Sequence, residues 1–179
     1  MERILLASGD VKLESPLKLE DAGKLAPLAN DPSISQTIGS VGFPYPYTEE
    51  DARWFIEKNR IEIDRPFIID WFIIYKNEPV GIIGLKDIDY ENKRAHVGYW
   101  VNSRYRNKGI AGGSLRLVVD YSYRTLKMHR LYTSVMHNNP SSMRVLIKNG
   151  FSIEGIEKDS IFLKGKFYDM IKFGLIFRD

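Results

Sequence analysis

The chain has 179 residues, 44% of them hydrophobic, and a formal net charge of +3, which suit one domain over residues 1–179 and exclude a disordered chain. The mild positive charge tolerates an anionic ligand, but it does not indicate a nucleic acid, whose binding proteins carry a denser basic face. The absence of cysteine excludes a disulfide framework, a thiolate zinc site and a cysteine nucleophile. The longest apolar run near the start, residues 4–7, is too short for a signal peptide or a membrane span, so we expect a cytoplasmic protein.

The first part of the chain predicts one strand and two helices. Residues 11–17 have the pattern of a short strand. A helix follows over 20–29, with its apolar positions on one face, and Asn30-Asp31-Pro32 ends it. Thr48, with an acid three residues later, predicts the start of a second helix that continues to Lys58.

The middle of the chain predicts an antiparallel meander. Residues 70–75, 80–85 and 94–101 are rich in β-branched and aromatic side chains. Short turns separate them, and short turns join antiparallel neighbours.

The rest of the chain alternates between segments with the apolar spacing of a helix and segments with the composition of a strand. Apolar residues at helical spacing predict a long helix over 109–125, and a strand follows at 131–136. This strand–helix–strand order implies a parallel strand pair. A helix over 140–149, closed by a glycine, precedes two terminal strands at 152–163 and 167–177.

The loop between the strand at 94–101 and the long helix has the features of an anion site. A helix N-terminus offers unpaired N–H groups and a partial positive charge. Gly109 lets a phosphate oxygen approach closely, and Arg104, Arg106 and Lys108 add positive charge. By spacing alone, an ordinary glycine-rich helix start with solvated basic residues explains the segment equally well.

Several segments together resemble one protein family. Arg106-Asn107-Lys108-Gly109-Ile110-Ala111 resembles the Arg/Gln-x-x-Gly-x-Gly/Ala signature of the GNAT acetyltransferase superfamily. Residues 97–101, Val-Gly-Tyr-Trp-Val, resemble the Ile-Gly-Tyr-Trp-Leu strand of its RimJ/RimL-like branch. Residues 46–50, 139–151 and 164–169 resemble the second-helix start, the Asn-x-x-Ser-x-Arg-Val-Leu block and the terminal Gly-x-Tyr-x-Asp hairpin of that branch.

The resemblance implies a fold and an activity. The fold is α/β of the α+β type, with a mixed, mostly antiparallel central sheet, about four flanking helices and a splayed parallel strand pair at the cofactor site. The activity is an acetyl-CoA-dependent N-acetyltransferase acting on a primary amine.

The resemblance also implies how the acetyl donor is held. The pantetheine arm pairs with one strand as an extra strand would, and the pyrophosphate lies over the following loop. Asn139 matches a family position that bonds the pantetheine arm, although a helix cap before Pro140 explains it as well. The matching strand and loop positions are Tyr99, Trp100, Val101, Arg106, Asn107, Lys108, Gly109, Ile110, Ala111 and Gly112.

Two residues are candidates for catalysis. Attack by a neutral amine on a thioester benefits from a base and from a hydrogen-bond donor to the leaving sulfur. Many family members use a helix tyrosine as that donor, where this chain has Leu146, and the branch pattern offers Ser142 instead. The family's usual glutamate base corresponds to His96, which is either the base or a partly exposed strand residue. Three scattered histidines predict no metal site.

The amine pocket is expected among the variable parts of the family: the first two helices, residues 39–47 and the terminal hairpin. Aromatic candidates for its lining are Phe43, Tyr45, Tyr47, Trp54 and Tyr168. Carboxylates that would attract a cationic amine are Glu49, Glu50, Asp87, Asp89, Glu91 and Asp169.

The acceptor itself remains open at this point. We expect the N-terminal α-amine of a ribosomal or other protein, and a polyamine or another small amine is the alternative. A non-catalytic acyl-CoA-binding regulatory module is another alternative, because fold does not fix function. An RNA-associated role would use Arg116, Arg124, Lys127 and Arg130. A homodimer is compatible with the sequence but is not required by it.

Overall fold

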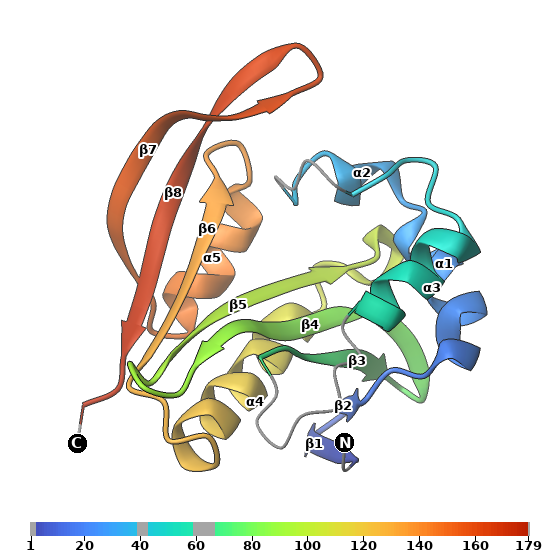
Figure 1. Ribbon diagram of the computed structural model, residues 1–179, viewed down its shortest axis with the longest axis horizontal. Helices are drawn as coiled ribbons and strands as arrows, with labels where there is room; N and C mark the ends of the chain where they lie inside the picture. The colour runs from blue at the N-terminus through green and yellow to red at the C-terminus, as the bar shows by residue number, and fades with distance from the viewer. Residues whose placement is uncertain (1–2, 39–42, 59–66, 179) are drawn as a thin grey trace.

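The computed structural model describes residues 3–38, 43–58 and 67–178 (Figure 1). In these residues eight strands form one sheet in the order β1-β2-β3-β4-β5-β6-β8-β7. The strands are β1 (Ile4–Ser8), β2 (Val11–Ser15), β3 (Ile69–Tyr75), β4 (Glu78–Asp89), β5 (Arg94–Val101), β6 (Arg130–Met136), β7 (Ser152–Leu163) and β8 (Lys166–Ile176). The helices are α1 (Ala22–Ala29), α2 (Pro32–Ser35), α3 (Glu49–Lys58), α4 (Ile110–Arg124) and α5 (Pro140–Lys148), with single 3-10 turns η1 (Leu19–Asp21) and η2 (Ser103–Tyr105).

The predicted three-strand meander is confirmed, and two more strands extend it: β2, which was expected as a strand, and β1, which was not. β2, β3, β4 and β5 pair in sequence, each antiparallel to the next. The apolar run near the start, which the sequence offered only as too short for a membrane, forms β1 and pairs with β2 through a tight turn at Gly9. β1 was missed because Ile-Leu-Leu-Ala-Ser is a short apolar run without the apolar–polar alternation that marks a half-buried strand, although its residues alternate between half-buried and exposed in the structure.

The predicted parallel pair is also confirmed. β5 leads through α4 to β6, and β6 pairs with β5 in parallel. β6 then pairs with β8 and β8 with β7, both antiparallel. The sheet is therefore mixed and mostly antiparallel, as the resemblance implied.

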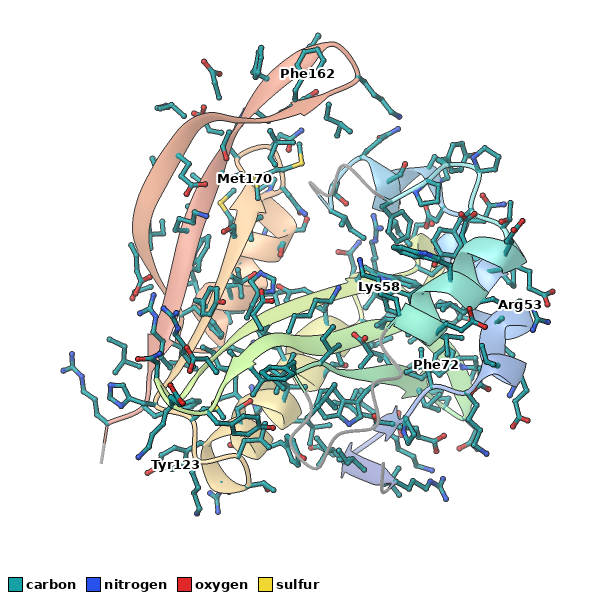
Figure 2. All side chains as sticks on the ribbon, in the orientation of Figure 1. Arg53, Lys58, Phe72, Tyr123, Phe162 and Met170 are labelled. Carbon is teal, nitrogen blue, oxygen red and sulfur yellow. The ribbon has the colours of Figure 1, made fainter. Side chains whose placement is uncertain are left out.

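The apolar core lies on both faces of the sheet. One cluster packs under α4 and includes Trp71, Leu115 and Phe173, each fully buried. The other packs α1 and α3 onto the opposite face, where Phe72 lies beneath α3 (Figure 2). Tyr47 belongs to this second cluster, so burial in the core, rather than lining of an amine pocket, explains it.

The terminal hairpin of β7 and β8 extends well beyond the rest of the sheet (Figure 1). Phe162 lies near its tip (Figure 2), where its ring is 4.9 Å from that of Phe167. Lys164 and Gly165 both have positive φ angles, which suits a two-residue turn between twisted strands.

The four predicted helices are all present, and a short α2 follows α1. Asp31 caps α2 by accepting a hydrogen bond from the N–H of Ser33. The same Asn-Asp-Pro sequence that ends the first helix therefore begins another one. No helix of the described residues is long and apolar enough to cross a membrane.

Candidate active site

Strands β5 and β6 run side by side only briefly and then separate (Figure 1). The paired residues are Arg94 with Arg130, Ala95 with Leu131 and His96 with Tyr132. From Val97 onward, β5 pairs with β4 on one side and has no strand partner among the described residues on the other. Backbone groups on this inner edge are left for a ligand that carries amides of its own.

Alternation along β5 decides which backbone groups face the separation. The N–H of Asn102 donates to the carbonyl of Val80, just beyond the end of the β4–β5 pairing, at 2.9 Å. Trp100, two residues earlier, therefore also directs its backbone groups to β4. The backbone groups of Tyr99 and Val101 face the separation instead.

Three contacts refine this picture. A Cβ added to Gly81 on β4 would collide with the carbonyl oxygen of Trp100, so that oxygen does not face the separation. Only the side chain of Trp100 is left to act there, and its ring meets that of Phe43 edge-on at 6.4 Å. The carbonyl of Val101 accepts a hydrogen bond from Nε of Arg106 at 3.0 Å, which ties the loop back onto the strand.

The start of α4 is open to an anion. Gly109 is its N-cap in the left-handed conformation, with φ 75°, and no side chain caps this helix in the described structure. The N–H groups of Ile110, Ala111 and Gly112 occupy the first three helical positions, which have no acceptor within a helix. A Cβ on Gly109 would meet no atom within 4 Å, so the space beside Gly109 is open. Because Ile110 is 2% exposed, only its backbone is available.

Basic side chains surround this helix start. Arg104, Arg106 and Lys108 are all exposed. Asn107 adopts a positive φ of 62°, which asparagine tolerates better than most residues. Nζ of Lys108 lies 5.5 Å from the ring centre of Tyr105. The predicted loop residues therefore form one exposed, positively charged turn at the open end of β5.

A clamp that the sequence did not reveal holds the beginning of this loop. One carboxylate oxygen of Asp31 accepts from the N–H and hydroxyl of Ser33, at 2.9 and 2.6 Å, and the other accepts from the N–H of Ser103 at 2.8 Å. Burial alone would raise the pKa of Asp31, but these hydrogen bonds lower it from 3.8 to about 2. Nδ2 of Asn102 adds a bond of 2.9 Å to the carbonyl of Leu28.

Ser142 and Asn139 meet at the start of α5. The side-chain oxygen of Asn139 accepts a hydrogen bond from the N–H of Ser142 at 3.2 Å, so the helix cap is confirmed. A contact between Asn139 and the pantetheine arm of the acetyl donor stays a prediction. The hydroxyl of Tyr99 reaches across from β5 to Oγ of Ser142 at 3.0 Å. Burial raises the pKa of Tyr99 to about 12. Leu146, where many family members have tyrosine, is fully buried one turn further along α5.

His96 lies at the point where β5 and β6 part. Its ring meets that of Tyr132 edge-on at 5.5 Å. Burial lowers the pKa of His96 below its usual 6.5, Asp87 opposes the shift, and Lys86 and Lys172 add to it. The imidazole is therefore neutral at neutral pH and free to accept a proton.

The structure does not bring the two catalytic candidates together on one face. Side chains alternate along β5, and Tyr99, which contacts Ser142, is three residues from His96. His96 consequently points to the face of α1 and α3, whereas Ser142 lies on the face of α4 and α5. The separation between β5 and β6 lies between them.

An acidic cavity of about 530 Å³ adjoins His96 through Tyr132, which lines it. Asp87, Asp89 and Glu91 also line it, together with Arg94. Nε of Arg94 is 3.3 Å from Asp89, so the other two carboxylates provide most of its negative charge.

Other predicted charges are neutralised by neighbours. Glu49 pairs with Arg53 at 2.6 Å, and Asp169 pairs with Lys158 at 2.7 Å. Arg130, one of the four residues offered for RNA, forms an ion pair with Glu154. No cluster of three potential metal ligands occurs in the described residues.

Comparison with known proteins identifies the family to which the chain belongs. A sequence profile for the acetyltransferase (GNAT) domain matches residues 13–152. The chain belongs to the GNAT acetyltransferase family. It lies in the RimJ/RimL-like branch and is an acetyl-CoA-dependent N-acetyltransferase. The separated strands and the open, basic helix start fit the amide-bearing arm and the pyrophosphate of that donor.

Relatives of this acetyltransferase act on different amines. It is 28% identical over 123 residues to the ribosomal-protein-serine acetyltransferase of Escherichia coli K12, covering 69% of each chain. It is 25% identical over 169 residues to the spermidine N(1)-acetyltransferase of the same strain, covering 90% of this chain and 83% of the other. Among solved structures, RimL, a ribosomal L7/L12 alpha-N-protein acetyltransferase in complex with coenzyme A, superposes with a TM-score of 0.88 at 23% identity, covering 97% of this chain and 98% of that chain.

Proposed function

We propose that this acetyltransferase modifies the N-terminal α-amine of a protein, with His96 as base and Ser142 as hydrogen-bond donor to the leaving sulfur. The observation that carries the proposal is the half-buried His96 at the base position, in place of a carboxylate. The ribosomal-protein relative supports the same class of acceptor.

The donor site follows from the open groups already described. The backbone groups of Tyr99 and Val101 bind the pantetheine arm, and Asn139 bonds it further along. The pyrophosphate lies on the amides of Gly109 to Gly112, with Arg106 and Lys108 beside it. Asn107 shapes the turn, and Trp100 contributes only its side chain.

Acetyl transfer needs little beyond correct positioning of the two substrates, one base for the amine and one hydrogen-bond donor for the leaving sulfur. When bound, acetyl-CoA supplies the acetyl group as a thioester. His96 accepts the proton that the amine nitrogen loses as it bonds to the acetyl carbon. Ser142 donates a hydrogen bond to the sulfur, which keeps the electron pair of the broken C–S bond and later takes a proton from water.

A weak base suits an amine that is already partly neutral. An α-amine has a pKa of about 7.7–8.0, so roughly one in ten is neutral at pH 7. A lysine-like primary amine has a pKa of about 10.4, so fewer than roughly one in a thousand is neutral. Because burial lowers the pKa of His96, this imidazole is poorly matched to the second kind of amine.

The acidic cavity favours a second candidate, a polyamine. Asp87 and Glu91 line a space next to the candidate base, and such a charge arrangement attracts a polycation. A spermidine-acetylating relative supports this alternative.

An acceptor panel distinguishes the two. We would compare a peptide with a free N-terminus, the same peptide blocked at its N-terminus but containing lysine, and spermidine, all at pH 7. Because the chain has no cysteine, released thiol can be measured directly with a thiol reagent. We expect a kcat/KM at least about tenfold higher for the free N-terminus, equivalent to about 1.4 kcal/mol. Faster acetylation of spermidine would refute the proposal, and sensitivity of that rate to Asp87→Asn would place the polyamine in the cavity.

A further inference from the structure

The hydroxyl of Tyr99 lies between two acceptors on one residue. Its oxygen is 3.0 Å from Oγ of Ser142 and 3.3 Å from the carbonyl oxygen of Ser142. A tyrosine hydroxyl has a single hydrogen. It therefore donates either to the carbonyl, which obliges Oγ of Ser142 to donate back to Tyr99, or to Oγ itself, which releases the hydrogen of Ser142 for another partner.

We propose that Tyr99 is a positioning residue that directs the hydroxyl hydrogen of Ser142 toward the sulfur of the acetyl donor. This inference rests on the role of Ser142 under the proposed function. When Tyr99 donates to Oγ of Ser142, the two hydroxyls act as one relay of hydrogen bonds. Ser142 then becomes a stronger donor, because each bond in such a chain polarises the next.

Three features of the structure make Tyr99 suited to this task. Among the described residues, Tyr99 is the sole hydrogen-bond partner of Oγ of Ser142. Burial raises the pKa of Tyr99 to about 12, so it keeps its hydrogen over the whole neutral range. The backbone of Tyr99 faces the separation of β5 and β6, so its position is coupled to the strand that holds the donor.

The inference also explains the departure at Leu146. Many family members have a tyrosine hydroxyl on this helix, whereas α5 has buried Leu146 at that position. A tyrosine from the neighbouring strand brings a hydroxyl to the same helix one turn earlier. The tyrosine hydroxyl is thus supplied from β5 rather than from α5, and it acts through Oγ of Ser142 on α5.

The first test measures the bound product and needs no acceptor amine. Coenzyme A is titrated in complex with the protein, and ultraviolet absorbance reports ionisation of its thiol, the only thiol present because the chain has no cysteine. A donor aimed at the sulfur stabilises the thiolate and lowers the pKa of the thiol. We expect the pKa of the bound thiol to be lower in the parent than in Tyr99→Phe or Ser142→Ala, with no further rise in the double variant.

Controls separate this role from a structural one. Tyr99→Phe keeps the partly buried ring, and calorimetry is expected to give a Kd for coenzyme A within about twofold of the parent. Tyr121→Phe removes another partly buried tyrosine hydroxyl, on α4, and is expected to leave the pKa of the bound thiol unchanged. Ser142→Thr keeps a hydroxyl at position 142. In that background, unlike in Ser142→Ala, Tyr99→Phe is again expected to raise the pKa of the bound thiol.

Rates give the second measurement. Thiol release from acetyl-CoA, to water or to a peptide, is expected to fall about tenfold in kcat in either single variant, with KM for the donor within about twofold. The double variant is expected to be no slower than the slower single one, because residues that act as a unit are not additive.

Each outcome decides one point. If Ser142→Ala raises the pKa of the bound thiol but Tyr99→Phe does not, or if the two losses multiply, the inference about Tyr99 is overturned while the role of Ser142 stands. If Ser142→Ala changes nothing, both fall. Neither result bears on which amine is acetylated, because the titration contains none.

Discussion

Replacing Asp31 by asparagine is expected to loosen the start of the loop proposed to bind the acetyl donor, and to change how the free energy of unfolding depends on pH. Asp31 is 7% exposed and binds both α2 and the N–H of Ser103. Asparagine can still cap α2 with its oxygen, but its amide then faces the N–H of Ser103, donor against donor. The loop therefore loses its anchor to α2.

The loss of stability expected for Asp31→Asn follows from the pKa of Asp31, which falls from 3.8 to about 2 on folding. At about 1.4 kcal/mol per pKa unit, this shift corresponds to about 2 kcal/mol of stability. Because the folded-state pKa is the lower one, the stabilisation is present above pH 3.8 and is lost as the pH falls toward 2. For a domain of this size, a loss of about 2 kcal/mol lowers Tm by roughly 4–8 °C.

Urea unfolding of the parent and Asp31→Asn, followed from pH 7 to pH 2.5, measures this effect. We expect the free energies of unfolding to differ by about 2 kcal/mol at pH 7 and to converge as the pH falls below 4. Asp120→Asn, at an exposed position of α4, is the control and should stay within about 0.5 kcal/mol of the parent. A difference that is absent at pH 7, or that persists unchanged to pH 2.5, would refute the reasoning.

Three further predictions concern the donor site and the base. Gly109→Glu adds backbone strain and a negative charge at the proposed pyrophosphate site, and calorimetry is expected to show at least about thirtyfold weaker binding of acetyl-CoA. Gly9→Glu, also at a positive φ with open space around its Cβ position, adds the same strain elsewhere and should leave that affinity unchanged; equal losses would assign the effect to strain. The rate of acetyl transfer should fall as the pH is lowered through the pKa of His96, which lies below 6.5. His96→Asn should lower kcat and abolish this decrease at acid pH. An unchanged pH–rate profile would remove His96 from the mechanism. Asn139→Ala should cost about 1 kcal/mol in urea unfolding through loss of the α5 cap, whereas unaltered stability with weaker donor binding would leave only the ligand role.

The periodicity of apolar residues and the positions of turn and cap residues predicted most of the fold. The long helix, the meander and the parallel pair follow from apolar spacing and short turns, which are local properties. β1 was not predicted because its five residues form a short apolar run without apolar–polar alternation. α2 was not predicted because the Asn-Asp-Pro sequence signals the end of a helix, although Asp before Pro also caps a new one.

The candidate site was predictable in its loop and less so in its partners. Residues 106–112 are consecutive, so their chemistry could be recognised before their position was known. The clamp from Asp31 to Ser103 spans distant parts of the chain, and no local pattern marks it. Alternation on β5 also separates Trp100, whose backbone pairs with β4, from Tyr99 and Val101, whose backbone groups face the separated strands.

By itself the sequence determined the family, the acetyl donor and the residues of the loop that we propose binds phosphate, because these depend on residue types at short spacings. The tertiary structure alone decided which groups meet. It placed the hydroxyl of Tyr99 on Ser142, put His96 on the other face of the sheet, and gathered three carboxylates around one cavity. The physical reason is that these contacts join residues far apart in the chain, and their geometry exists only once β5 and β6 have paired and then separated.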